Sequence, residues 1–351
     1  MIKICQIIRP DFKAVEGYLT ESFATGQLSN GGPCYKLLCQ RLAQRFQEQS
    51  QCDKLYVAVV SSGHTALTAA YAAADIYAPL IPAYTFRSTW LAVPQDDWSS
   101  YTSCFSDVSK SGCIAPQNVE EALKEATLDS VVAVTALSVI PDLAELDKLC
   151  FDTGKKLIID AAPGFGTPGI YDYGVATCLS FHATKTLPIG ECGAVVSRDP
   201  EIIKHVERYV NFGFGKGVTL DGPGFNGKVS EYTCAIGLSL LDVIDIHIHN
   251  RLKNAALYRE LLPNSLFPVS RPGTVYQVFP IFLEDCDRAD LIGKTLAAKG
   301  IQTLKYYPPL GSSALYPVAK SLYDRNVCLP VHGDVSEDDI KFIAETVKSC
   351  L

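Results

Sequence analysis

Short hydrophobic runs and helical patterns alternate along the first 230 residues of the chain. Nearly continuous hydrophobic runs predict strands that are buried on both faces. These runs occupy residues 55–60, 79–82, 130–135, 156–160, 178–181 and 193–197. Hydrophobic residues at helical spacing occupy residues 34–50, 65–74 and 142–153. Strands alternating with helices predict an α/β fold, with a mostly parallel central sheet flanked by helices.

The pattern changes after Ser230. Residues 231–248 carry hydrophobic residues at helical spacing throughout, which predicts one long helix with Ser230 as its N-cap. Beyond it, residues 276–282 predict a strand, 288–299 a helix and 301–303 another strand. We therefore expect a large domain over residues 1–230 and a smaller α+β domain over residues 231–351.

Composition narrows the classes of partner. The chain has 351 residues, 48% of them hydrophobic, and a formal net charge of −7. This charge, with no run rich in Lys and Arg, argues against nucleic acid, and no hydrophobic stretch is long enough for a membrane span. The 13 cysteines include no C-x-x-C pair. His247 and His249 have no pair of cysteines nearby, so we expect no metal site.

Lys185 is the strongest candidate for chemistry. It follows the predicted strand 178–181 in a short polar loop. If that loop is buried, the pKa of the lysine falls and the neutral amine becomes a nucleophile that can form an imine. Taken alone, a surface lysine is the more common interpretation. Asp160 changes the balance, because a carboxylate at a strand end can pair with the ring nitrogen of pyridoxal phosphate (PLP). A turn cap is the alternative for Asp160.

A turn between a predicted strand and a predicted helix, at Ser61-Ser62-Gly63-His64-Thr65, is a candidate phosphate site. Gly63 allows the backbone to turn closely, and the amides at a helix start bind phosphate well. An ordinary strand–helix connection is the alternative.

Together these three elements resemble the DegT/StrS family of PLP-dependent nucleotide-sugar aminotransferases. The resemblance continues in the family's order through residues 81–86, 211–214, 224–231, 306–310 and 328–330. No single segment is specific, but the ordered set is. It implies a fold-type-I PLP-dependent transferase in which Lys185 binds PLP covalently and Asp160 opposes its ring nitrogen.

The resemblance implies further cofactor contacts. The backbone of Gly63, His64 and Thr65 and the hydroxyl of Ser180 would bind the phosphate, and Phe86 would cover the ring face. Asn226 would reach the phosphate of a neighbouring subunit, which implies a homodimer with shared active sites. A core phenylalanine, a strand serine and a turn asparagine are the alternatives.

Two positions depart from the family. His64 stands where the family usually has the threonine of Gly-Thr-Ala, so a hydroxyl contact is in doubt although the backbone contacts should survive. Pro163 stands where many members have glutamine or histidine against the phenolic oxygen of the cofactor. Proline has no side-chain donor, so that contact is absent or is supplied elsewhere.

The resemblance implies that the enzyme moves an amino group from L-glutamate to a keto-deoxy sugar linked to dTDP or UDP, for amino-sugar and surface-polysaccharide synthesis in a reducing cytoplasm. Lys185 would act as general base and acid. Family members that dehydrate sugars have histidine at that position. Lys305, beside Tyr306, is a candidate for the substrate diphosphate, with a solvated lysine as the alternative. His182 and Glu191 are expected to support the loop.

Three other functions remain open. Another PLP enzyme of this fold could act on amino acids, and a non-catalytic regulator could retain PLP. Residues 164–169 fit G-x-G-x-x-G, a pattern that suggests a nicotinamide dehydrogenase as the third alternative. A dinucleotide site needs a helix that begins in this turn, and Pro168 makes such a helix improbable.

Overall fold

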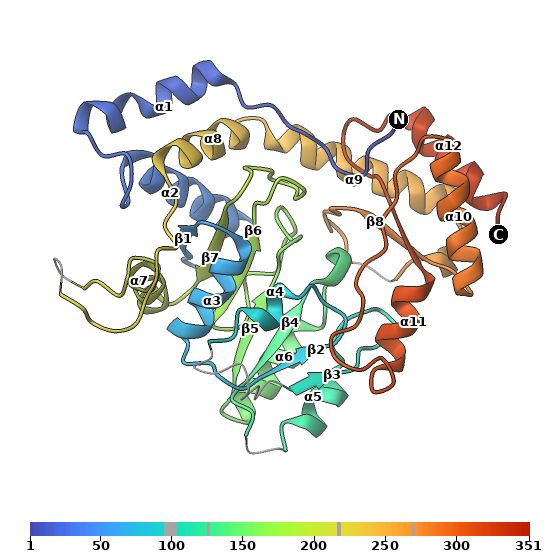
Figure 1. Cartoon of the computed structure of the whole chain (residues 1–351), viewed down its shortest axis with the longest axis horizontal. Helices are drawn as coiled ribbons and strands as arrows, with labels where there is room; N and C mark the ends of the chain where they lie inside the picture. The colour runs from blue at the N-terminus through green and yellow to red at the C-terminus, as the bar shows by residue number, and fades with distance from the viewer. Residues whose placement is uncertain (95–103, 125–126, 216–218, 269–270) are drawn as a thin grey trace.

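A large sheet forms the centre of the molecule (Figure 1). The computed structural model describes residues 1–94, 104–124, 127–215, 219–268 and 271–351, and in these the sheet has seven strands in the order β1-β7-β6-β5-β4-β2-β3. β7 is antiparallel to β1 and β6, and the other neighbouring pairs are parallel. The strands are β1 (Tyr56–Val60), β2 (Pro79–Pro82), β3 (Cys104–Ser106), β4 (Ser130–Val134), β5 (Lys156–Asp160), β6 (Ala176–Ser180) and β7 (Gly193–Ser197). The predicted, mostly parallel sheet is confirmed.

Each face of the sheet has its own hydrophobic core. Val57 and Val59 of β1 belong to one core and Ala58 and Val60 to the other, because successive side chains of a strand point to opposite faces. The first core includes residues of α2 (Pro33–Glu48), α5 (Pro116–Ala122), α6 (Leu143–Asp152) and α8 (Glu231–Leu241). The second includes residues of α3 (Gly63–Ala73), α7 (Pro200–Tyr209) and α11 (Pro317–Arg325). Burial on both faces explains the continuous hydrophobic runs.

A third core lies in the C-terminal region. There β8 (Phe279–Phe282) pairs antiparallel with β9 (Asn326–Leu329), and the helices α10 (Cys286–Ala298) and α12 (Glu337–Lys348) pack nearby. Ile2 joins this core, so the start of the chain lies against its C-terminal part (Figure 1).

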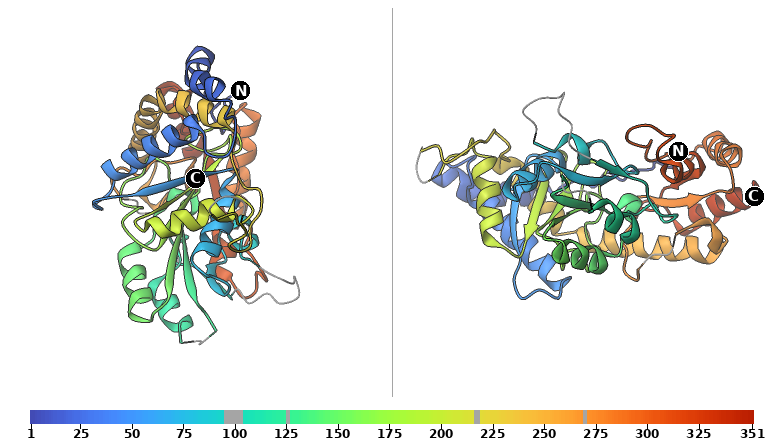
Figure 2. Two further views of the ribbon diagram at one scale, coloured as in Figure 1. Left: turned by 90° about the vertical axis from the view of Figure 1, so that its left-hand side faces the viewer. Right: turned by 90° about the horizontal axis from the view of Figure 1, so that it is seen from below.

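The predicted long helix after Ser230 is wrong. Ser230 does cap a helix, since its hydroxyl accepts a hydrogen bond from the amide of Thr233 at 3.2 Å. However, α8 ends at Leu241, and α9 (Ile244–Leu261) is a separate helix. The break has a packing reason. Helix α8 packs beside α1 (Phe12–Thr25) in the first core, whereas the C-terminal half of α9 joins the third (Figure 2). The division predicted at residue 230 stays a prediction, and α8 packs with the residues before it.

Two predicted strands also differ from the structure. Residues 301–303 form no strand, because Ile301 makes only an isolated bridge to Ile2. β8 begins at Phe279 rather than at residue 276, because the backbone groups of Gln277 bond to side chains instead of to a neighbouring strand.

The remaining elements are short, and they include α4 (Ser88–Leu91) and the 3-10 helices η1 (Ala136–Ser138) and η2 (Asn264–Leu266). None of the helices in the described part of the chain is long and apolar enough to cross a membrane. No helix begins in residues 164–175, all of which are described, so the G-x-G-x-x-G segment lacks the helix N-terminus that a dinucleotide requires.

Candidate active site

A cavity of about 470 Å³ lies at the carboxyl ends of the sheet strands. Strands β1, β4, β5 and β6 end just before or at the wall residues Ser62, Thr135, Asp160 and Ser180. Ligands of open α/β sheets bind at this edge, and the volume falls in the range of ordinary small-molecule sites. The topology thus gathers residues that are about 120 positions apart in the sequence.

Lys185 reaches this cavity from the loop after β6. Its backbone amide donates to the carbonyl of His182 at 2.8 Å, which closes a tight turn. Its ammonium donates to Oε1 of Gln277 at 3.1 Å. Burial lowers the pKa of Lys185, while the nearby charge of Asp160 acts in the opposite direction. The amine is therefore easier to deprotonate than that of an ordinary lysine, as a nucleophile requires.

Asp160 is only 4% exposed at the end of β5. Its Oδ2 accepts a hydrogen bond from the Thr89 hydroxyl at 2.7 Å, and its Oδ1 accepts one from the Ala162 amide at 3.1 Å. Burial raises the pKa of Asp160, whereas these two hydrogen bonds and Lys185 lower it. Asp160 therefore caps a turn, as the alternative interpretation expected, and also presents an oriented carboxyl group to the cavity.

The start of α3 forms a narrow cradle next to Ser180. The Ser62 side chain caps the helix by accepting from the Thr65 amide at 3.0 Å, and Gly63 opens the first turn. A Cβ added at Gly63 would lie 2.7 Å from Cβ of Ser180, closer than atoms can pack. Only glycine lets the helix start approach the end of β6 this closely, and the first amides of a helix have no intrahelical partner.

Of the other residues predicted to contact the cofactor, Phe86 and His64 line the cavity and Thr65 does not. Phe86 lines the cavity with 63% of its surface exposed, so it is not a core phenylalanine. His64 also lines the cavity, and its Nδ1 lies 2.9 Å from the Ser88 hydroxyl. Thr65 is buried, with its hydroxyl against Ser61 and Ser62.

Asn226 lies outside the cavity. It is exposed and forms an isolated bridge with Asn211. Within its own chain Asn226 does not line the cavity, and its predicted role toward the cofactor of a neighbouring subunit stays a proposal.

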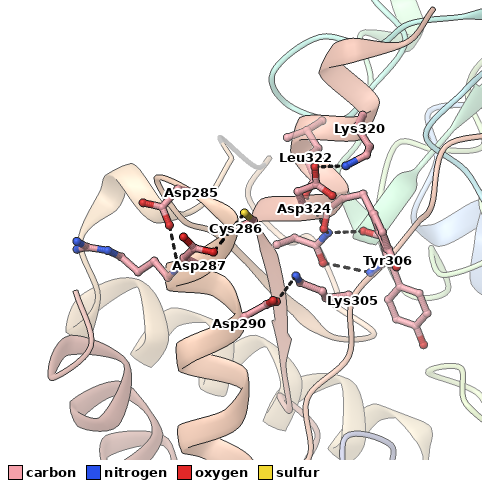
Figure 3. Close-up of polar contacts among 12 residues, drawn as sticks. Asp285, Cys286, Asp287, Asp290, Lys305, Tyr306, Lys320, Leu322 and Asp324 are labelled. Carbon is pink, nitrogen blue, oxygen red and sulfur yellow. Dashed lines mark hydrogen bonds and ion pairs between the residues drawn. The ribbon is translucent and has the colours of Figure 1, made fainter. Parts of the chain in front are cut away.

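Lys305 and Tyr306 point to opposite sides of their segment (Figure 3). The ammonium of Lys305 forms an ion pair with Asp290 of α10 at 2.6 Å, whereas Tyr306 lines the cavity together with Tyr307. Of the two predicted substrate contacts, the structure places only Tyr306 at the site.

The loop that carries Lys185 has two polar neighbours in the cavity wall. His182 lies with Nδ1 2.9 Å from the Thr184 hydroxyl and with Nε2 3.7 Å from Glu191. These contacts fit the supporting roles expected for His182 and Glu191.

Gln277, Thr89 and Tyr307 were missed by the sequence interpretation. The hydroxyl of Thr89 lies 2.8 Å from that of Thr85, four residues earlier. Two threonines at helical spacing just after a strand were the sequence signal from which Thr89 could have been predicted. Gln277 had no signal, because it comes from an irregular segment 92 residues from its partner Lys185.

A carboxyl group and a lysine with a lowered pKa meet in one cavity at the carboxyl edge of the sheet, which is the pair of groups that a PLP-dependent enzyme uses. The chain belongs to the DegT/DnrJ/EryC1/StrS aminotransferase family, which it matches over residues 13–348. It is therefore an enzyme of a family of PLP-dependent sugar aminotransferases.

Individual relatives agree with this assignment. The dTDP-4-amino-4,6-dideoxy-D-glucose transaminase of Escherichia coli is 27% identical over 368 residues, covering 96% of this chain and 95% of the relative. The UDP-4-amino-4,6-dideoxy-N-acetyl-beta-L-altrosamine transaminase of Helicobacter pylori is 24% identical over 71% of this chain and 72% of its own length. The crystal structure of DesI with its TDP-sugar product has a TM-score of 0.84 and 25% identity, covering 99% of this chain and 92% of that one.

The residues present fit PLP. The close approach at Gly63 brings the start of α3 and the Ser180 hydroxyl to the cavity side by side, the buried Asp160 lines the same cavity, and Phe86 offers an exposed aromatic surface. The described residues thus include a helix start for a phosphate, an aromatic side chain and a carboxyl group for a ring, and an amine for a covalent link.

Proposed function

We propose that this enzyme transfers an amino group from L-glutamate to the ketone of a deoxy sugar linked to dTDP or UDP. The observation that carries the proposal is the placement of Lys185 and Asp160 in one cavity, in a chain of this family. The E. coli and H. pylori relatives, named for dTDP- and UDP-linked amino sugars, support the substrate class.

The residues divide the work between binding and proton transfer. When bound, PLP supplies a ring that accepts the electron pair of the substrate carbon. Asp160 would keep the proton on the ring nitrogen, because an ionised carboxylate stabilises a cation beside it. The start of α3 and Ser180 would hold the phosphate, and Phe86 would cover the ring. Nζ of Lys185 would hold the cofactor covalently and, when free, would act as the base and acid that carries the proton of the substrate carbon.

We also propose a homodimer in which Asn226 acts on the cofactor of the neighbouring subunit. Its exposed position outside its own cavity supports this role. Mixing Lys185→Ala subunits with Asn226→Ala subunits should partly restore activity, because one class of hybrid site then has both native residues. No recovery after proven subunit exchange would place Asn226 outside the mechanism or within its own site.

The substrate class is tested in a single half-reaction. Enzyme carrying the amino form of the cofactor should return to the carbonyl form when a keto-deoxy sugar linked to dTDP or UDP is added. Free keto sugars should react poorly, because binding energy from the nucleotide is used to lower the barrier. If only 2-oxo acids discharge the enzyme, it acts on amino acids instead. If nothing discharges it, the protein is a regulator that retains PLP.

A further inference from the structure

Gln277 contacts the reactive amine of Lys185 through its side-chain amide. Its Oε1 accepts the hydrogen bond of Lys185 Nζ at 3.1 Å, and its side chain is 7% exposed in the cavity wall. Its Nε2 makes no hydrogen bond to any residue in the described part of the chain. An amide has both an acceptor and a donor, so half of the bonding capacity of Gln277 is free to serve a ligand.

The surroundings fix Gln277 firmly. Its backbone amide donates to the Ser138 hydroxyl at 3.3 Å, and its carbonyl accepts from Nη1 of Arg251 at 3.0 Å. Arg251 is 2% exposed, and the same Nη1 donates to the carbonyl of Tyr276. Burying a guanidinium is costly, so its use on two successive carbonyls indicates a segment that must not move.

Strain points to the same segment. Leu137 and Ser138 have φ values of 53° and 65°, in the left-handed region that non-glycine residues rarely adopt. Such backbone strain is found most often at functional sites. Here it directs the Ser138 hydroxyl toward the amide of Gln277.

Pro163 offers no donor to the cavity. It lines the cavity just after Asp160 and Ala162, and proline has neither a side-chain donor nor a backbone N–H. In PLP the phenolic oxygen stands next to the carbon that joins Nζ of the lysine. A group in contact with Nζ is therefore also within reach of that oxygen.

We propose that Gln277 supplies the donor that Pro163 cannot, with its Nε2 donating to the phenolic oxygen of the cofactor bound at Lys185 and so setting the protonation of the linkage between them. This inference rests on the proposed cofactor site. Loss of the proton from the linkage leaves more negative charge on the phenolic oxygen, and a hydrogen-bond donor stabilises that form. Gln277 therefore favours the deprotonated linkage at a given pH.

Other titratable groups face this part of the cavity, and they are the same in the parent enzyme and in the Gln277 variants compared below. They come from the N-terminal segment, β5, α9, the start of α3 and the loops that line the cavity, and are Cys5, Asp160, Arg251, His64, His182, Glu191, Tyr306 and Tyr307.

The test is a pH titration of the visible absorption of the holoenzyme, which reads the linkage without any turnover. Gln277→Leu should raise the midpoint by about one pH unit, because a hydrogen bond to a charged oxygen has about that strength. Gln277→Glu, which keeps the shape, should raise it further, since a carboxylate favours the protonated linkage. Gln302→Leu is the matched control, since Gln302 bonds the amide of Ile4 outside the cavity and should leave the midpoint unchanged.

The possible failures are distinguishable. Unchanged midpoints in both Gln277 variants overturn the inference, as does a shift seen only in Tyr306→Phe or Tyr307→Phe, which would assign the donor to a tyrosine. A parent enzyme that binds PLP without a titrating linkage to Lys185 would instead refute the proposed function.

Discussion

The two walls of the cavity are built in different ways. One wall comes from the ends of sheet strands, where Asp160, Ser180 and the turn at Gly63 are fixed by regular hydrogen bonding. The other comes from irregular C-terminal segments, where Gln277 and Tyr306 are held by side-chain contacts to the backbone, such as those of Arg251 and Asn326.

The difference concerns function as well as construction. The sheet wall carries the groups that we propose bind the cofactor, and their positions follow from the fold itself. The C-terminal wall carries groups whose identity can vary without loss of the sheet, and it is there that we place the adjustment of the cofactor and contact with the substrate. Changes in the sheet wall should therefore cost the most.

Asp160→Asn should have the largest effect of the variants in the sheet wall. Losing the charge opposite the ring nitrogen removes several kcal/mol from the transition state, and each ~1.4 kcal/mol is a factor of ten, so half-reaction rates should fall by about a thousandfold or more. Stability should be unchanged or higher, because the buried charge is removed.

Stopped-flow rates and thermal unfolding of the same samples check this expectation. Asp129→Asn is the matched control, since the Asp129 carboxylate lies outside the cavity, where it accepts hydrogen bonds from the amides of Tyr77 and Ala78 and from the Ser130 hydroxyl. It should lower stability and leave the rate intact. Near-normal transfer by Asp160→Asn would make Asp160 a turn cap only.

Gly63→Ala should weaken cofactor binding by about tenfold or more. The added Cβ would meet Ser180 at 2.7 Å, and relieving such a clash costs about 1–3 kcal/mol. Equilibrium dialysis with PLP measures the effect. In Gly293→Ala the new methyl group meets only the Thr303 hydroxyl at 3.9 Å, so this helix variant should bind PLP normally. Equal affinities would show that the cradle is not the phosphate site.

Lys305→Ala should have the smallest effect. An exposed ion pair contributes about 0–1 kcal/mol, so stability should fall slightly, and equally in Asp290→Ala. We expect an unchanged KM for the nucleotide sugar, because the ammonium is bound to Asp290 rather than in the cavity. A raised KM in Lys305→Ala alone would support the predicted contact with the diphosphate.

The positions of the residues in the sheet wall could be predicted from the sequence, whereas those of the residues in the C-terminal wall could not. Lys185, Asp160 and Gly63 each stand within a few residues of a strand that its hydrophobic run identifies, so topology brings them together. Gln277 and Tyr307 come from segments without regular pattern, and their positions depend on contacts such as that of Arg251 with two carbonyls. The break between α8 and α9 was missed for a related reason, since both helices are hydrophobic and only packing separates them.

The central claim is that Lys185 is the residue that binds the cofactor. Borohydride reduction of the holoenzyme, followed by peptide mapping, tests it directly. We predict one phosphopyridoxyl group per chain, on Lys185, and labelling that persists to lower pH than for an ordinary lysine, because burial lowers the pKa of its amine. A label on Lys228 or on no lysine at all would contradict the account.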